Sequence, residues 1–187
     1  MRIGIVHGRF QPLHLGHLHD YILCAKKQCD FIIVGITNPD PTHTLPDESN
    51  LSRTRPHNNP MTYYERLVIL QDALIEVGLD RSEFTIVPFP INFPQLLKYY
   101  TPETGIHYLT VFDDWGESKT NSLKRAGCKT SILFRKDISE KTISSTMVRE
   151  LIVKKGNWES LVPKSSIQHI ENYKIRERLL KIRNQSI

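Results

Sequence analysis

Cysteine is scarce in this sequence. The chain of 187 residues holds three, Cys24, Cys29 and Cys128, and no pair has the CxxC spacing of a zinc or redox site. We therefore expect free thiols in a reducing cytoplasm, with neither a disulfide framework nor a protein-bound zinc ion.

Long apolar runs are missing as well. The longest, from Phe31 to Ile36, is far too short to span a bilayer, and the start of the chain lacks the apolar stretch and cleavage site of a signal peptide. These absences predict a cytoplasmic protein without a membrane partner. Repeats and low-complexity segments are also absent. A composition of 39% hydrophobic and 24% charged residues excludes a disordered chain, a collagen and a coiled coil.

Length and charge narrow the possibilities further. The length predicts one domain, residues 1–187, with a helical subregion at about 144–187. The net charge of +5 favours an anionic partner, which includes both nucleic acids and phosphorylated metabolites. Two common phosphate-binding signatures, GxGxxG and GxxxxGK[ST], do not occur, so a phosphate site must be built from other residues.

Strand and helix patterns alternate through most of the chain. We expect strands at 2–7, 30–36, 83–87, 107–112 and 129–134, and helices at 15–27, 62–78, 92–100, 118–126, 145–155 and 163–183. This alternation predicts an α/β fold: a Rossmann-like parallel sheet with helices on both faces and a C-terminal helical region. In such sheets, ligands bind beyond the carboxyl ends of the strands, near the topological switch point.

The segment from Thr37 to Pro60 interrupts this alternation. It holds five of the eleven prolines and no glycine, and it is too long for a plain connection. It is either a lid that closes on a ligand or an insertion without catalytic consequence. Thr62 follows it, with Glu65 three residues later, which is the pattern of a capping box at a helix start.

A phosphate site is predicted where the first strand ends and a helix begins. Backbone N–H groups at a helix start favour an anion, and Arg9 adds a fixed positive charge. His14 and His17 are three residues apart, so both imidazoles can face one ligand, while Gly8 and Gly16 leave room for it. The whole segment reads Gly8-Arg9-Phe10-Gln11-Pro12-Leu13-His14-Leu15-Gly16-His17.

A second candidate anion site lies before the helix expected at 145–155. Hydroxyl groups and unpaired N–H groups gather there, and Arg149 follows about one turn later. Taken alone, these hydroxyls could simply cap the helix. The segment reads Ile143-Ser144-Ser145-Thr146-Met147-Val148-Arg149.

Both segments resemble the paired HxGH and ISSTxxR motifs of the nucleotidyltransferase superfamily. The residue pattern of the first segment is most similar to that of nicotinamide mononucleotide adenylyltransferases of the archaeal type. Asn59-Pro60-Met61-Thr62 resembles a further segment of that branch. The resemblance implies catalytic roles for Arg9, His14, His17 and Arg149. It implies nucleotide binding by Gly8, Phe10, Gln11, Gly16, Ile143, Ser144, Ser145 and Thr146. It implies substrate binding by Arg53, Arg55, Asn59, Thr62 and Arg66.

One segment departs from the adenylyltransferase pattern. Asp113-Asp114-Trp115 follows the fourth expected strand, at the ligand edge of the sheet, and resembles the glycerol-3-phosphate cytidylyltransferase branch instead. We therefore include these three residues among the nucleotide-binding candidates. Because of these residues, the base of the nucleoside triphosphate can be either adenine or cytosine.

The reaction implied is transfer of a nucleoside monophosphate from a nucleoside triphosphate to a phosphate acceptor, with release of pyrophosphate. ATP and nicotinamide mononucleotide, giving NAD, are the leading pair; CTP with a small phosphate or phosphonate is the alternative. Mg²⁺ is expected to bind through the substrate phosphates, because the sequence offers no evident all-protein metal site. A homo-oligomer is compatible with the family.

A nucleic-acid-binding module is the remaining alternative. HxGH also resembles the HIGH motif of class I aminoacyl-tRNA synthetases, but the chain is short for a synthetase and has no KMSKS-like segment. Glu171 and Glu177 interleave with the C-terminal basic residues, which favours a solvated helix face. Those basic residues are Lys174, Arg176, Arg178, Lys181 and Arg183.

Overall fold

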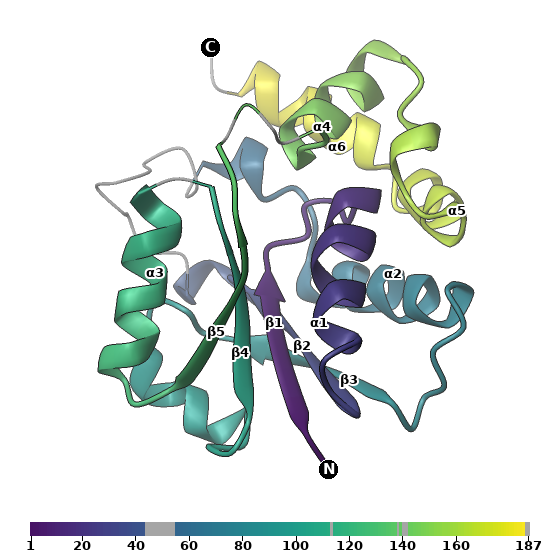
Figure 1. Cartoon of the computed structure of the whole chain (residues 1–187). Coiled ribbons are helices and arrows are strands. Elements are labelled where there is room, and N and C mark those ends of the chain that lie inside the picture. Colours follow the sequence, from purple (N-terminus) through teal and green to yellow (C-terminus); the bar gives the residue numbers. More distant parts are fainter. Residues whose placement is uncertain (44–54, 113, 138, 140–141, 186–187) are drawn as a thin grey trace.

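A computed structural model describes residues 1–43, 55–112, 114–137, 139 and 142–185. Within these residues, five strands form one parallel sheet in the order β3-β2-β1-β4-β5 (Figure 1). The strands are β1 (Ile3–Gly8), β2 (Phe31–Thr37), β3 (Phe84–Phe89), β4 (Ile106–Val111) and β5 (Lys129–Arg135). The Rossmann-like sheet predicted from the alternating pattern is thereby confirmed.

The strand order fixes where a ligand binds. The chain builds β1, β2 and β3 in one direction, then returns to place β4 on the other side of β1. This reversal makes the carboxyl ends of β1 and β4 the topological switch point, which is where open α/β sheets bind ligands. The loop with the HxGH segment leaves β1 at this point, and the segment that begins at Phe112 leaves β4 there.

Helices cover both faces of the sheet, as the sequence predicts (Figure 1). Side chains of η1, α1 and α2 pack on one face in the larger hydrophobic core, and Leu123 of α3 and Leu97 of η5 pack on the other. The helices on the first face are η1 (Gly16–Leu23), α1 (Cys24–Lys26) and α2 (Tyr63–Glu76). Those on the second are η5 (Pro94–Tyr99) and α3 (Asp114–Arg125).

The remaining helices lie over the carboxyl-end edge of the sheet and beside α2 (Figure 1). Their apolar side chains, among them Ile152, Ile170 and Leu179, belong to the same core as η1 and α2. Within the described ranges, no helix is long and apolar enough to cross a membrane. These elements are η2 (Pro41–His43), η4 (Pro56–Asn58), α4 (Ser145–Lys154), η7 (Glu159–Leu161), α5 (Lys164–Asn172) and α6 (Ile175–Asn184).

Three helices that cover the sheet differ from the sequence expectation, and the segment expected to be helical at 163–183 divides into α5 and α6 at Tyr173 and Lys174. The helix expected at 15–27 begins as a π-helix, η1, and continues as α1. The one expected at 92–100 is a 3-10 helix, η5, which begins with Pro94. The third, α3, begins at Asp114 and not at residue 118. Hydrophobic periodicity shows that a helix exists, but it does not separate these helix types or fix a first turn built from polar residues.

Candidate active site at the switch point

The loop after β1 is buried and rigidly attached to the segment before α2. The Gln11 side chain donates to the Met61 carbonyl and accepts from the Met61 N–H, both at 2.9 Å. The Phe10 ring folds back over Gly8, where a Cβ atom would lie 2.9 Å from it. Gly8 is therefore needed for this close approach. Both Phe10 and Gln11 shape the loop from within.

The loop delivers two histidines to the start of η1 as a stacked pair. The rings of His14 and His17 are 3.6 Å apart between centroids and inclined by 23°. The His17 N–H donates to Nδ1 of His14 at 3.3 Å, so a neutral His14 carries its proton on Nε2 and can donate it to a phosphate oxygen. Gly16 lies between them, where a Cβ atom would come within 3.3 Å of the His14 ring.

Arg149 joins the second predicted motif to the first. Its side chain is 1% exposed, and Nη1 donates to the Gln11 carbonyl at 2.7 Å. Nη2 donates to Oγ1 of Thr146 at 3.2 Å and to Oδ1 of Asn58. Burial lowers the pKa of this guanidinium to about 10, so it stays charged at neutral pH. A positive charge is thus fixed beside the HxGH loop.

The hydroxyls before α4 have separate tasks. Ser144 is the N-cap of α4, and its Oγ accepts from the Met147 N–H at 3.2 Å. The Ser145 hydroxyl donates to the Pro12 carbonyl at 3.1 Å, which fastens the start of α4 to the HxGH loop. Ile143 precedes them and packs on the larger core. The structure therefore brings the two motifs into direct contact, although more than 100 residues separate them.

Arg66, unlike Arg149, donates its hydrogen bonds to backbone carbonyls alone among the described residues. Its guanidinium donates to four backbone carbonyls at 2.7–3.1 Å, so it ties the start of α2 to the ends of β1 and β2. Burial lowers its pKa to about 10. The contacts indicate a clamp on the loop backbone; the predicted contact with substrate stays a prediction. The acceptor carbonyls belong to Arg9, Thr37, Asn38 and Thr62.

The other predicted substrate-binding residues lie in or near the segment before α2. Thr62 is the N-cap of that helix, and with Glu65 it forms the predicted capping box. Asn59 donates through Nδ2 to the Arg55 carbonyl at 3.1 Å, while the Arg55 residue is exposed. Arg53 lies outside the described residues. Binding of substrate by these side chains stays a prediction.

The Asp-Asp-Trp segment sits at the junction of β4 and α3. Asp114 is the first residue of α3, and Trp115 lies in its first turn. Asp113 falls outside the described residues. The backbone therefore places Asp114 and Trp115 beyond the carboxyl end of β4, the strand that pairs with β1.

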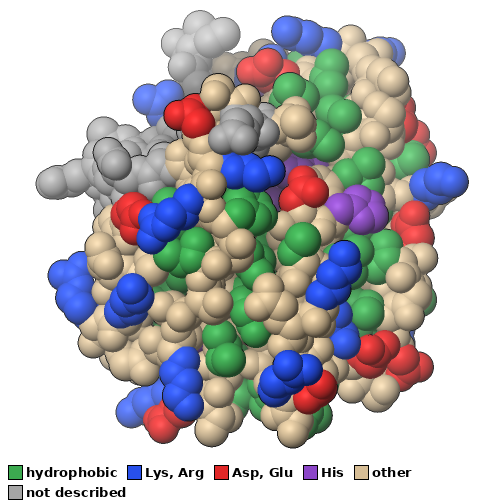
Figure 2. All heavy atoms as spheres, in the orientation of Figure 1, with side chains coloured by type: hydrophobic (Ala, Val, Ile, Leu, Met, Phe, Trp, Pro, Cys, Tyr) green, Lys and Arg blue, Asp and Glu red, His purple; other side chains and the backbone are tan. Residues whose placement is uncertain are grey.

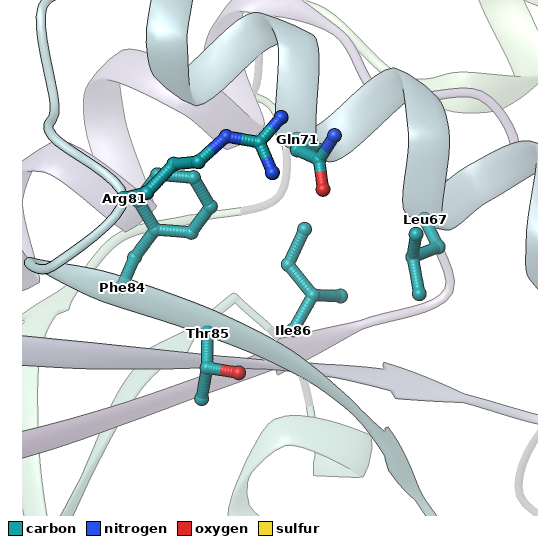
Figure 3. Close-up of a pocket in the computed structure, with 6 residues that line it drawn as sticks. All are labelled: Leu67, Gln71, Arg81, Phe84, Thr85 and Ile86. Carbon is teal, nitrogen blue, oxygen red and sulfur yellow. The ribbon is translucent and has the colours of Figure 1, made fainter.

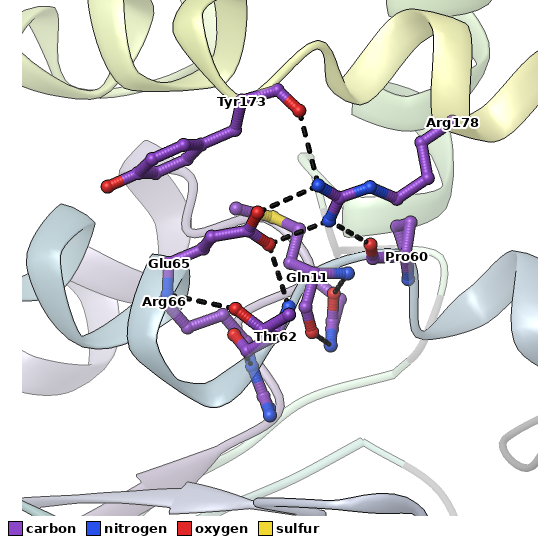
Figure 4. Close-up of polar contacts among 8 residues, drawn as sticks. Gln11, Pro60, Thr62, Glu65, Arg66, Tyr173 and Arg178 are labelled. Atoms are coloured by element: carbon purple, nitrogen blue, oxygen red, sulfur yellow. Dashed lines mark hydrogen bonds and ion pairs between the residues drawn. The ribbon is translucent and has the colours of Figure 1, made fainter.

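Sequence reasoning missed three residues around the site. Asn58 holds Arg149, and Arg178 of α6 donates both terminal nitrogens to the Glu65 carboxylate at 2.7 and 2.8 Å (Figure 4). His7 of β1 is buried against Phe89, with ring centroids 4.4 Å apart. Burial, Lys119 and His107 all lower the pKa of His7. No local sequence pattern predicts these contacts. The capping box indicates only that Glu65 has a structural role at the start of its helix.

Two of the basic C-terminal residues, Arg176 and Arg178, form hydrogen bonds within the protein. Arg178 is committed to Glu65 and to the carbonyls of Pro60 and Tyr173, and Nε of Arg176 donates to the Val153 carbonyl at 3.2 Å. On the face in Figure 2, Lys and Arg side chains are scattered among Asp and Glu. The interpretation of the C-terminal basic residues as a solvated helix face stays a prediction.

A separate hollow lies beside β3, the strand at one side edge of the sheet (Figure 3). It has a volume of about 240 Å³ between α2 and the edge strand β3, and contains no predicted site residue. Its lining consists of Leu67, Gln71, Arg81, Phe84, Thr85 and Ile86.

Comparison with known proteins assigns the family. The family model described as cytidylyltransferase-like matches residues 5–151, which include both motifs and the β4–α3 junction. The chain belongs to the cytidylyltransferase-like family. Its curated relatives are nucleotidyltransferases, and this chain is therefore a nucleotidyltransferase too.

Two kinds of relative cover nearly all of the chain. A phosphonoformate cytidylyltransferase of Streptomyces viridochromogenes is 40% identical over 176 residues, which are 94% of this chain and 94% of that protein. A nicotinamide-nucleotide adenylyltransferase of Thermococcus sibiricus is 34% identical over 182 residues, 94% of this chain and 87% of that protein. The resemblance inferred from HxGH and ISSTxxR is thereby confirmed.

Solved structures support the fold of this cytidylyltransferase-like chain. It superposes on a bifunctional NMN adenylyltransferase/ADP ribose pyrophosphatase of Francisella tularensis with a TM-score of 0.68 at 17% identity. The match covers 98% of this chain and 54% of that one, so the chain spans about half the length of this neighbour. A structure of the same enzyme complexed with AMP and a manganese ion gives a TM-score of 0.63 at 15% identity.

Proposed function

We propose that this enzyme is a cytidylyltransferase that transfers CMP from CTP to a small phosphonate or phosphate and releases pyrophosphate. The observation that carries the proposal is the Asp113-Asp114-Trp115 segment at the β4–α3 junction, the part of the switch point where the sequence departs from the adenylyltransferases. The 40% identity to a phosphonoformate cytidylyltransferase, over nearly the full length of both chains, supports the same base and a small acceptor.

The reaction needs little covalent help from the protein. An oxygen of the acceptor phosphonate attacks the α-phosphorus of CTP, the bond from that phosphorus to the bridging oxygen breaks, and pyrophosphate leaves in line with the attack. The attacking oxygen is already ionised at neutral pH, so no strong general base is required. Catalysis then rests on placing the two reactants and stabilising the negative charge that develops.

The switch-point residues match this requirement. His14 and His17 lie side by side, where they can donate to the α- and β-phosphates as charge shifts to the leaving group. Arg149 and Arg9 supply positive charge for the β- and γ-phosphates, and the Thr146 hydroxyl and the N–H groups at the start of α4 add donors. The Ser145 bond to the HxGH loop keeps both halves of the site in register.

Mg²⁺ belongs to this reaction as part of the nucleotide substrate. The side chains that surround the site are imidazole, guanidinium, hydroxyl and amide groups, which suit phosphate oxygens better than a hard cation. Among the described residues, no group of three or more His, Cys, Asp or Glu side chains could hold a metal ion. The ion would neutralise phosphate charge while the protein groups orient the triphosphate.

Synthesis of NAD from ATP and nicotinamide mononucleotide is the second candidate. The relatives at 30–34% identity favour it, since they are named nicotinamide-nucleotide adenylyltransferases and are covered over 86–97% of their length. The pattern Gly-Arg-Phe-Gln-Pro-x-His-x-Gly-His after β1 also favours an adenylyltransferase. Base and acceptor are thus the two features that an experiment must decide.

Phosphorus NMR distinguishes the two reactions directly. With CTP, phosphonoformate and Mg²⁺, the proposal expects pyrophosphate and a new product in which the phosphonate is linked to CMP. With ATP and nicotinamide mononucleotide under the same conditions, it expects no NAD above a background rate. Formation of NAD with no CMP-linked product would overturn the proposal and establish the second candidate.

A further inference from the structure

Three basic side chains from separate elements meet around η4, at the edge of the proposed triphosphate site. His57 lies in η4, Arg149 in α4 and Arg183 in α6. The Asn58 bond to Arg149 fastens η4 to α4, and α6 packs against both of these elements. The fold therefore holds the three side chains in one place rather than leaving them to meet by chance.

In the described part of the chain, Glu150 is the carboxylate whose charge acts on both His57 and Arg149. Within the described residues, neither Arg149 nor Arg183 forms an ion pair, and the carboxylate that acts on the charge of His57 is that of the exposed Glu150. Burial and the charges of Arg149 and Arg183 lower the pKa of His57, an effect that Glu150 only partly offsets. Like charges held together destabilise a fold unless a ligand compensates for them.

Two nitrogen atoms of this cluster also lack a hydrogen-bond partner in the described part of the chain. They are Nε of Arg149, whose side chain is 1% exposed, and Nδ1 of the partly buried His57. A buried polar atom without a partner is costly, and binding of a ligand is one reason for a native structure to keep one. An anion with several acceptor oxygens would suit this cluster, since the charges of both guanidinium groups act on the imidazole of His57.

We propose that His57 and Arg183 extend Arg149 into a binding site for the terminal phosphate of the nucleoside triphosphate, and for the pyrophosphate that leaves. This inference rests on the proposed nucleotidyl transfer, but it does not depend on which base or acceptor is used. The position fits, because the same Arg149 guanidinium also holds the Gln11 carbonyl of the HxGH loop. Binding the leaving group through these two residues stabilises the charge that it gains as the bond breaks.

The test measures direct binding of inorganic pyrophosphate and of CMP to the full chain by calorimetry. CMP lacks the terminal phosphates and serves as the internal reference. Arg183→Gln should weaken pyrophosphate binding by about tenfold, the usual effect of losing one charge-assisted bond, and leave CMP binding unchanged. His57→Gln, in a short peripheral helix, should weaken pyrophosphate binding several-fold.

Lys181→Gln is the matched control, because it removes one positive charge from an exposed position on the same helix, α6. It should change pyrophosphate affinity by less than about twofold, as expected for a screened surface charge. Equal weakening in Arg183→Gln and Lys181→Gln, or unchanged affinity in both Arg183→Gln and His57→Gln, would overturn the inference. Thermal unfolding checks that each variant is folded. If Arg183→Gln does not fold, pyrophosphate binding by His57→Gln still tests the site.

The result separates this inference from the proposed function. Pyrophosphate binding requires neither CTP nor an acceptor, so a wrong assignment of the base removes the CMP reference but leaves the comparison of pyrophosphate affinity between the variants intact. Conversely, turnover of CTP together with wild-type pyrophosphate affinity in both variants would reject the His57 and Arg183 site and leave cytidylyl transfer standing.

Discussion

Two buried arginines illustrate how a side chain's partners define its role. Arg66 donates to four backbone carbonyls, and this arrangement fits a residue that holds the loops in shape. Arg149 shares its donors between a carbonyl, an amide and a hydroxyl, and its Nε has no partner among the described residues. We therefore expect loss of Arg66 to affect stability first, and loss of Arg149 to affect ligand binding first.

Arg66→Ala should lower the free energy of unfolding by about 3 kcal/mol or more, because it leaves buried carbonyl groups without donors. Urea denaturation measures this change. The sequence predicts instead that Arg66 binds substrate. A variant as stable as the wild type, with a raised KM for the acceptor, would support that role and contradict the clamp.

His17→Ala should lower kcat by about 10²–10³-fold, as expected when one donor to the developing charge is removed. Nucleotide affinity should change much less, because the interaction strengthens in the transition state. His19→Ala is the matched control, since His19 lies on the same helix, η1, but is exposed. Similar turnover in the two variants would remove His17 from the catalytic assignment.

At the scale of elements, α2 and α6 are joined by one ion pair at the start of α2. Burial raises the pKa of the Glu65 carboxyl, but hydrogen bonds from Arg178 and the Thr62 N–H outweigh it, so the pKa lies below its ordinary value. A depressed carboxyl pKa stabilises the fold above the pKa of unfolded glutamate, and this contribution is lost as the pH falls through the lower folded value.

Glu65→Gln should therefore be less stable than the wild type at neutral pH and lose less stability on acidification. The check is the free energy of unfolding from urea titrations at about pH 7 and about pH 3. Glu171→Gln, at an exposed glutamate on α5, should follow the wild type. If Glu65→Gln tracked the wild type across this range, the ion pair would not join the two helices.

The sequence pattern predicts the strands well, but it does not predict the contacts between elements. All five strands lie close to their predicted ranges, because continuous apolar runs such as the one in β2 are typical of strands buried on both faces. The capping box at Thr62 was also readable, since it depends on residues three apart. Asn58 on Arg149 and Arg178 on Glu65 join residues 91 and 113 positions apart, and no local pattern encodes such pairs.

At the scale of the whole molecule, the strand order brings the two motifs together. The HxGH loop reaches the switch point because β1 is the central strand, and the ISSTxxR segment reaches it because the last strand, β5, leads into α4 at the same edge. The sequence contains both motifs, and the phosphate chemistry that it predicts for their residues stays a prediction. It did not show that Arg149 and Ser145 contact the HxGH loop directly, since that depends on how the C-terminal helices pack over the sheet.

We propose that this scaffold activates a small phosphonate or phosphate with CTP. The most direct measurement is the initial rate of pyrophosphate release with Mg²⁺, using CTP or ATP, each with phosphonoformate, nicotinamide mononucleotide or no acceptor. We expect release that requires both CTP and the phosphonate, with a higher kcat/KM for CTP than for ATP. Release that requires ATP and nicotinamide mononucleotide, with none from CTP and the phosphonate, would contradict the proposal.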